Sequence, residues 1–203
     1  MPRTSTAKER LTEAALKMIW RHSYGATSVD AICDQAKVKK GSFYYFFKSK
    51  CDLAVAALEA DWKAQRAQLD TIFSPTVPPL ERLRLYFEFS LEHLQKIKEE
   101  CGAVLGCPLN ALGSEVCTQD TALRAKIHEI LDRKLTYFES VIRDAHAQGL
   151  IVAPDAKAKA RTLFMFTQGA LTQARIQNNL ELLADIYPCT LDLLGAPAPE
   201  PSR

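Results

Sequence analysis

The chain has 203 residues, of which 47% are hydrophobic and 25% charged, which is typical of a globular protein with a core of its own. No apolar run approaches the roughly 18 residues of a membrane span, and the N-terminal segment lacks the features of a signal peptide, so we expect a cytoplasmic protein. The net charge of +2 conceals an uneven distribution, because residues 1–50 hold ten lysines and arginines but four acidic residues. A basic first quarter favours contact with a polyanion, although chance scatter of surface charge is the alternative.

The cysteines do not predict a disulfide scaffold. There are six of them in a chain without an export signal, and they form neither a CxxC motif nor a Cys/His pair at zinc-ligand spacing. We therefore expect buried free thiols and neither a metal nor another cofactor.

Apolar periodicity predicts three short helices in the first fifty residues. The first carries apolar residues at spacings of three and four between positions 11 and 19, with Thr4, Ser5 or Thr6 as its cap. A second, of about two turns, starts at a cap provided by Thr27 or Ser28, and a third begins near Lys39 after a tight turn. Three short helices with this turn are the frame of a helix-turn-helix.

The third helix contains five consecutive aromatic residues between lysines. Phe43, Phe46 and Phe47 are three and four residues apart, so we expect them to share a face that packs on the first two helices. Tyr44 and Tyr45 then point elsewhere, where their hydroxyls can donate to phosphate oxygens. The run is therefore interpreted as a small core interleaved with a DNA-facing surface; an aromatic core helix with incidental lysines is the alternative.

The remainder of the chain is also predicted to be helical. A linking helix covers about 49–73, and the Pro-rich segment 74–79 breaks it. Pro188 is expected to kink or interrupt the last helix, and residues 196–203 form a Pro-rich tail that we expect to be disordered. The other predicted helices cover residues 80–100, 109–117, 120–146, 154–179 and 180–194.

The segment "GATSVDAICDQAKVKKGSFYYFFKSKCDL" resembles the DNA-binding signature of the TetR/AcrR family of bacterial transcriptional regulators. The stretch "GCPLNALGSE" resembles a subset of that family with a Gly-Cys-x-x-x-Asn motif. Two positions depart from the pattern: Lys37 stands where the family often has Gly, at a cost of order 1 kcal/mol if φ is positive, and Phe46 stands where His or Tyr is common. Carried over by position, the residues expected to touch DNA are Thr27, Ser28, Lys39, Lys40, Gly41, Ser42, Tyr44, Tyr45, Lys48 and Lys50.

The resemblance implies an all-α homodimer that binds a palindromic operator on double-stranded DNA and holds a small-molecule inducer. Residues 1–50 are the expected helix-turn-helix domain and 51–195 the ligand-binding and dimerisation domain. Its last two helices are expected to form the dimer, with a purely internal core as the alternative. Polar or reactive side chains on apolar faces are the candidates to line the ligand pocket: Phe89, His93, Cys107, Asn110, Tyr137 and Gln168.

Three other functions were weighed. Cys107 precedes Pro108 at a helix start, where the helix dipole lowers a thiol pKa, so this residue, together with Cys101, is a candidate sensor of electrophiles or oxidants. The sequence contains no Gly-rich phosphate loop, GxSxG or HExxH motif, so we do not expect an enzyme. A helical adaptor without DNA binding is the remaining alternative.

Overall fold

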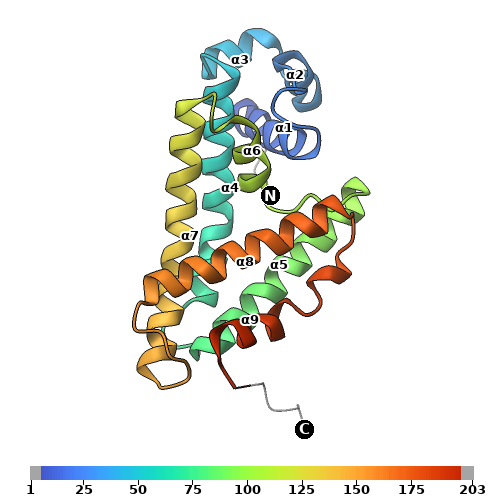
Figure 1. Ribbon diagram of the computed structural model, residues 1–203. Coiled ribbons are helices and arrows are strands. Elements are labelled where there is room, and N and C mark those ends of the chain that lie inside the picture. The colour runs from blue at the N-terminus through green and yellow to red at the C-terminus, as the bar shows by residue number, and fades with distance from the viewer. Residues whose placement is uncertain (1–5, 198–203) are drawn as a thin grey trace, which may run out of the picture. The chain divides into compact units, whose positions relative to one another are not determined.

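The computed structural model describes residues 6–197, and all regular structure among these residues is helical, as predicted (Figure 1). The helix ends lie within a few residues of those expected from the sequence, except near the C-terminus. The helices are α1 (Ala7–Arg21), α2 (Val29–Ala36), α3 (Lys40–Phe46), α4 (Lys50–Ile72), α5 (Pro79–Cys101), α6 (Pro108–Val116), α7 (Thr121–Ala147), α8 (Ala156–Ile176), the 3-10 turn η1 (Glu181–Leu183) and α9 (Ile186–Leu194).

The chain forms two compact units. The first contains α1 to α3, α4 as far as Arg66, and the segment Pro108–Leu131; the second contains Ala67–Cys107 and the chain from Asp132 onward. The long helices α4 and α7 each contribute residues to both units. None of the helices in the described part of the chain combines the length and the apolarity that a bilayer crossing requires.

Local side chains explain where the first helices begin and end. Thr6 caps α1 in a capping box: its hydroxyl accepts from the Glu9 amide at 3.2 Å, while the Glu9 carboxylate accepts from the Thr6 amide at 2.7 Å. The other proposed caps, Thr4 and Ser5, lie outside the described residues. Ser28, rather than Thr27, caps α2 by accepting from the Ala31 amide.

The core of the first unit joins the first three helices. Leu11, Ile32 and Phe43 have no solvent exposure, and Phe47 is also buried. Phe46 corrects the sequence prediction, because its side chain is 37% exposed and packs edge-on against Tyr45. A helix of two turns presents few positions to its neighbours, and the backbone at Phe47 is already extended, so Phe43 and Phe47 reach the interior and Phe46 does not.

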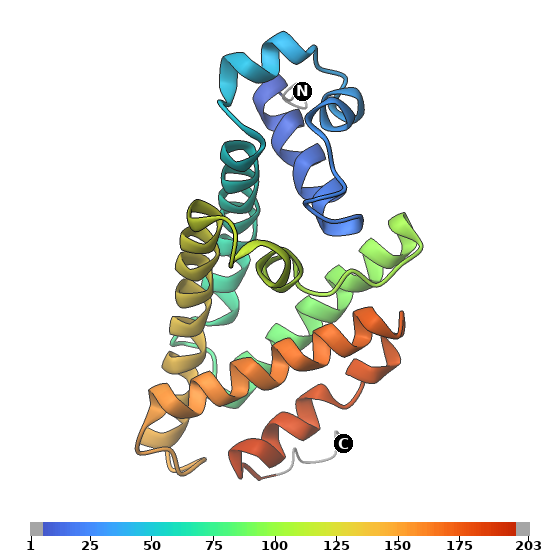
Figure 2. The same cartoon turned by 45° about the horizontal axis from the view of Figure 1, so that its top comes forward.

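In the second unit, α5, α8 and α9 lie alongside one another (Figure 2). Aromatic rings fill part of the core, with Phe138 in contact with Phe73, Tyr86 and Phe164 at centroid distances between 5.1 and 5.9 Å. Edge-on and tilted contacts of this kind add to the free energy gained from burial.

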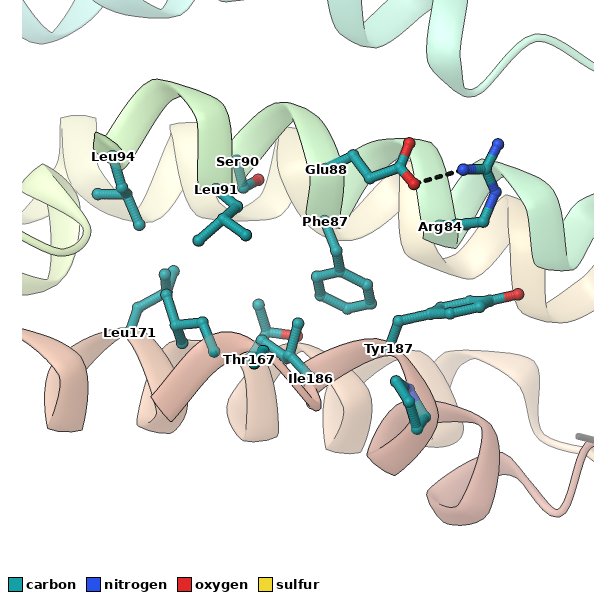
Figure 3. A pocket seen from close by; sticks show the side chains of 13 residues that line it. Arg84, Phe87, Glu88, Ser90, Leu91, Leu94, Thr167, Leu171, Ile186 and Tyr187 are labelled. Atoms are coloured by element: carbon teal, nitrogen blue, oxygen red, sulfur yellow. Dashed lines mark hydrogen bonds and ion pairs between the residues drawn. The ribbon is translucent and has the colours of Figure 1, made fainter. Parts of the chain in front are cut away.

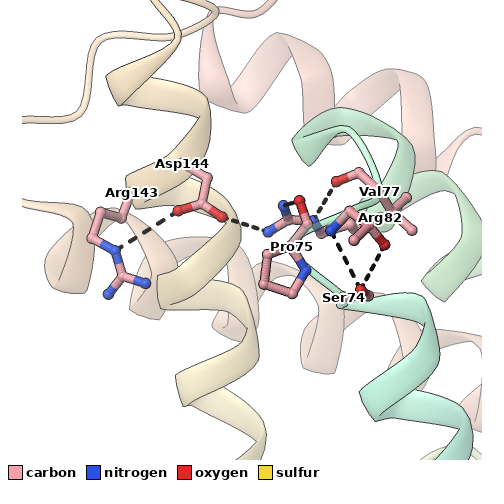
Figure 4. A network of polar contacts seen from close by, with 7 residues as sticks. Ser74, Pro75, Val77, Arg82, Arg143 and Asp144 are labelled. Carbon is pink, nitrogen blue, oxygen red and sulfur yellow. Dashed lines mark hydrogen bonds and ion pairs between the residues drawn. The ribbon is translucent and has the colours of Figure 1, made fainter.

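A buried arginine holds the loop between α4 and α5 (Figure 4). Arg82 is 1% exposed, and its guanidinium donates to the carbonyl oxygens of Val77 at 2.7 Å and Pro75 at 3.2 Å. It also donates to the carboxylate of Asp144 on α7 at 2.6 Å. The charge is thus paired and each guanidinium nitrogen donates a hydrogen bond, as a buried cation requires.

The C-terminal helix differs from the prediction. Pro188 does not interrupt it: the chain turns at Ala184 and Asp185, and Pro188 occupies the first turn of α9, where a helix has no use for the missing amide hydrogen. Of the tail expected to be disordered, residues 198–203 lie outside the described residues.

Candidate nucleic-acid interface and effector cavity

The turn between α2 and α3 requires an unusual backbone conformation. Lys37 has φ 53° and ψ 47°, the left-handed conformation that Gly adopts most readily. The Lys37 amide donates to the carbonyl oxygen of Asp34 at 3.1 Å, and the Val38 amide donates to the carbonyl oxygen of Cys33 at 2.9 Å. These two hydrogen bonds close the end of α2. The condition on which a strain of order 1 kcal/mol was expected at Lys37 is therefore met, and Lys37 adds an exposed cation there.

The two tyrosines of α3 point away from the core. Tyr44 is 58% and Tyr45 82% exposed, whereas Phe43 beside them has no exposure. The division between inward phenylalanine and outward tyrosine predicted from the sequence is therefore present for these three residues.

The cations around the tyrosines differ in what they contact. Lys39 and Lys48 are exposed, whereas the ammonium group of Lys40 lies 2.7 Å from the carboxylate of Asp30. The hydrogen bond to Asp30 raises the pKa of Lys40. Among the other expected contact residues, Ser28 and Gly41 are exposed and Ser42 is half-buried.

Thr27 and Lys50 interact with the protein in this structure. Thr27 is 2% exposed and its hydroxyl donates to the Ser23 carbonyl oxygen at 2.7 Å. The ammonium group of Lys50 donates to the carbonyl oxygens of Tyr24 at 2.8 Å and Thr27 at 3.0 Å, and lies over the Tyr24 ring at 4.1 Å. Both side chains thus fix the loop between α1 and α2.

A carboxylate on α6 holds the same loop, and sequence reasoning missed it. The two Glu115 oxygens accept from the backbone amides of Tyr24 at 2.8 Å and Gly25 at 2.6 Å. A Cβ at Gly25 would lie 3.1 Å from one of these oxygens, so glycine permits the close approach. Ninety residues separate Glu115 from this loop in sequence, and no local pattern connects them.

The second unit contains a cavity of about 250 Å³ between α5, α8 and the segment 183–188 (Figure 3). Its walls are mainly apolar, with Phe87 and Leu91 on α5 facing Leu171 on α8 and Ile186 on α9. Arg84 and Glu88 form an ion pair at one end.

None of the six pocket residues proposed from the sequence lines this cavity. Phe89 stacks on His93, which is exposed on α5. Tyr137 donates its hydroxyl to Asp70 and packs on Phe73. Asn110 is half-buried on α6, in the first unit, and Gln168 is buried with its side-chain oxygen lacking a hydrogen-bond partner among the described residues.

Cys107 is buried immediately before Pro108, the first residue of α6. Gly106 precedes it with φ 62°, and a Cβ there would lie 3.0 Å from the Leu171 carbonyl oxygen on α8. The Arg175 guanidinium donates to the Leu105 carbonyl oxygen at 3.0 Å. The loop that carries the thiol is thus held against α8, and both Cys101 and Cys107 are free thiols.

Family models match both parts of the chain. Residues 11–57 match the model described as bacterial regulatory proteins, tetR family, and residues 79–187 match the tetracyclin repressor-like C-terminal domain. The chain belongs to the TetR family of bacterial transcriptional regulators.

Individual TetR-family proteins are similar to this chain along most of their length. The transcriptional regulator AcuR of Cereibacter sphaeroides is 31% identical over 180 residues, covering 87% of this chain and 80% of that protein. The transcriptional repressor DhaR of a Mycobacterium species is 28% identical, covering 87% and 86%. These relatives and the family itself are regulators rather than enzymes.

Solved structures show the same TetR-family fold. A regulatory protein TetR from Rhodobacter sphaeroides gives a TM-score of 0.81 at 28% identity, covering 92% of this chain and 97% of that one. The reduced form of NemR from Escherichia coli gives a TM-score of 0.80 at 19% identity, covering 96% and 100%. The first three helices of this regulator are therefore its DNA-binding helix-turn-helix.

Proposed function

We propose that this TetR-family regulator is a cytoplasmic, ligand-responsive repressor that binds a palindromic operator as a homodimer and is released by a small-molecule inducer. The observation that carries the DNA-binding part is the exposure of Tyr44 and Tyr45 among Lys39 and Lys48 on α3. The relatives DhaR and NemR are both named transcriptional repressors, which supports repression rather than activation.

The dimer proposal is supported by the outer face of α8. Met165 is 61% and Ile176 70% exposed, and their separation of eleven residues, about three turns, places them on the same side of the helix. Gly169 lies between them, and a Cβ there would meet nothing within 4 Å. An apolar face with a small residue at its middle suits close approach of a second α8, so the last two helices are the proposed dimer contact, as the sequence suggested.

Operator binding tests the DNA-binding proposal directly. Duplex DNA from the region upstream of the protein's own gene should bind with an affinity that falls steeply with salt. Lys48→Ala should reduce the slope of log K against log salt by about 1, the loss of one phosphate contact. Lys63→Ala, on α4 with its side chain 71% exposed, is the matched control and should leave the slope unchanged.

Tyr45→Ala separates a DNA-facing tyrosine from a structural one. We expect it to weaken operator binding by about tenfold to a hundredfold, in line with about 1–3 kcal/mol for a good contact, with the free energy of unfolding unchanged within about 0.5 kcal/mol. Full operator affinity in this variant would contradict the role given to α3, and failure of the wild type to bind DNA would leave the adaptor alternative.

Sedimentation analysis tests the dimer. Met165→Arg should shift the wild-type dimer toward monomer, because a buried unpaired charge opposes association. Val152→Arg, at an 81% exposed position of the same unit, is the control. An unchanged dimer in the Met165→Arg protein would exclude the outer face of α8 as the contact.

A thiol sensor at Cys107 is the second candidate function. It is favoured by the position of the thiol directly before the first turn of α6 and by the similarity to NemR, of which a reduced form has been solved. Cys107→Ser should abolish release from the operator by reactive carbonyls and peroxides, while Cys189→Ser, at an exposed thiol, should not. Unchanged release in the Cys107→Ser protein would exclude the sensor.

A further inference from the structure

The cavity between α5, α8 and the segment 183–188 has a definite chemical character. Its apolar surface comes from α5, from α8, and from the turn and the first residues of α9, and the rings of Phe87 and Tyr187 lie at one side of it (Figure 3). A partly open hollow lined in this way favours an apolar occupant, because apolar surface is removed from water on both partners.

The charged groups at the end of the cavity are already neutralised by one another. Arg84 donates through Nε to Glu81 at 2.8 Å and through its two terminal nitrogens to Glu81 and Glu88. The hydrogen bond to Glu81 raises the pKa of Arg84 and lowers that of Glu81. A ligand carboxylate would have to displace a glutamate from this cluster, and a ligand cation would have to displace the arginine.

The neutral polar groups in the wall are bonded as well. The Thr167 hydroxyl donates to the Leu163 carbonyl oxygen at 2.9 Å, and the Tyr187 hydroxyl donates to the Leu80 carbonyl oxygen at 3.4 Å. Ser90 interacts with the Tyr86 hydroxyl. The wall therefore has no strong requirement for a polar partner, which disfavours sugars, nucleotides and other highly polar ligands.

The size of the cavity limits the ligand further. Its volume of about 250 Å³ exceeds the ~150 Å³ of an apolar cavity that accommodates benzene. A molecule of one or two fused aromatic rings would fill it and could stack against Phe87 and Tyr187.

The cavity and the proposed dimer face use different sides of α8. Thr167 and Leu171 face the cavity, and each is two residues, or about 200°, from Gly169 at the middle of the outer face. The cavity therefore lies on the other side of α8 from that face, while its wall includes the first residues of α9.

We propose that this cavity is an effector site for a small, uncharged aromatic molecule of one or two rings. This inference rests on the proposed ligand-responsive function. The ligand is held between α5 and α8 and contacts residues 183–188, so that its binding is linked to the position of α9 and thereby to the dimer that presents two copies of α3 to DNA.

Indole is a suitable probe, and indole-3-carboxylate is its charged counterpart. Calorimetry on the full-length protein without DNA should show saturable indole binding and a raised Tm, with the carboxylate at least tenfold weaker. Ala184→Trp, at an exposed position of the cavity wall, should fill the space and weaken indole binding at least tenfold. Ala147→Trp, at an exposed position at the end of α7, should not.

A second filling variant, Leu91→Trp, guards against a local effect at Ala184 and should weaken indole binding to a similar degree. Equal binding of indole and its carboxylate, or indole binding undiminished in both filling variants, would overturn the proposal. Binding that strengthens on dilution to monomer would also overturn it, because a second copy of the chain would then be the occupant.

Operator titrations with and without indole separate this inference from the proposed function. Release of the wild type, but not of Ala184→Trp, supports both. Operator binding without any indole binding removes the aromatic-effector inference and leaves the regulator intact. Indole binding by a protein that shows no operator affinity removes the regulator and leaves the binding site.

Discussion

The two compact units differ in how their clusters of aromatic residues are placed. In the helix-turn-helix, neighbouring rings divide between the interior and the surface, with Phe43 buried and Tyr45 82% exposed. In the second unit, Phe73, Phe138 and Phe164 are all buried and in contact. Aromatic content alone therefore says little about function. In the helix-turn-helix, the exposed rings beside a buried one mark the surface that is available to bind DNA.

Truncation of buried rings should give the largest effects. Phe43→Ala and Phe138→Ala should each lower the free energy of unfolding by about 3–5 kcal/mol, because each removes a ring that has almost no exposure. Urea denaturation measures this, and Tyr44→Ala provides the exposed control with a change of about 0.5 kcal/mol or less. A comparable loss in Tyr44→Ala would refute the division between inward and outward rings.

Arg82 should give the next largest effect. Arg82→Met removes the partner of Asp144 and leaves the carbonyl oxygens of Pro75 and Val77 without their donor. We expect Arg82→Met to lower the free energy of unfolding by about 3 kcal/mol. This is the low end for breaking a buried ion pair, because the Asp144 side chain is 27% exposed. Arg143→Met, 64% exposed and 3.9 Å from Asp144, should cost under about 1 kcal/mol.

Comparison of these regions also shows how far the sequence predicts the molecule. Helix order and the outward tyrosines follow from apolar spacing, caps and the break at residues 74–79, since these are local signals. The exposure of Phe46 could not be predicted from the spacing of apolar residues, because that spacing places Phe46 on the same face as Phe43. Packing against the neighbouring helices determines how many residues of that face are buried.

Local sequence patterns could not predict the cavity or the contacts of the loop between α1 and α2. The cavity depends on the turn at Ala184 and Asp185, where the sequence suggested a helix from about residue 180 that is kinked or interrupted at Pro188. The bonds of Glu115 join segments ninety residues apart. Both features arise from tertiary contacts between elements that were individually predictable.

Glu115 tests how strongly α6 supports the DNA-binding helices. Glu115→Gln replaces one of two acceptors with a donor that faces a backbone amide, so we expect a loss of about 1–2 kcal/mol in unfolding free energy, with weaker operator binding because the loop before α2 is loosened. Glu92→Gln, exposed on α5, is the control. Unaltered stability and operator affinity would show that Lys50 and Thr27 alone suffice to hold the loop.

The smallest effect compares helix caps in the two units. Asp120 accepts from the amides of Ala122 and Leu123, both at 3.0 Å, at the start of α7, and Asp155 accepts from Ala158 at 2.9 Å at the start of α8. Replacing either aspartate by Ala should lower the free energy of unfolding by about 1 kcal/mol at pH 7.

The two caps should differ in how this cost depends on pH. The amide of Leu123 and the other donors lower the pKa of Asp120 from its ordinary 3.8. The folded protein therefore binds this proton less readily than the unfolded chain does, and the contribution of Asp120 to stability is complete above about pH 4 and is lost as the pH falls through the lower folded pKa. Asp120→Asn keeps an acceptor without a titrating charge, so the difference in unfolding free energy between wild type and this variant should shrink between about pH 4 and pH 2. A difference that stays constant over that range would mean that the carboxylate caps α7 by geometry alone and that its charge contributes nothing to the stability of the helix.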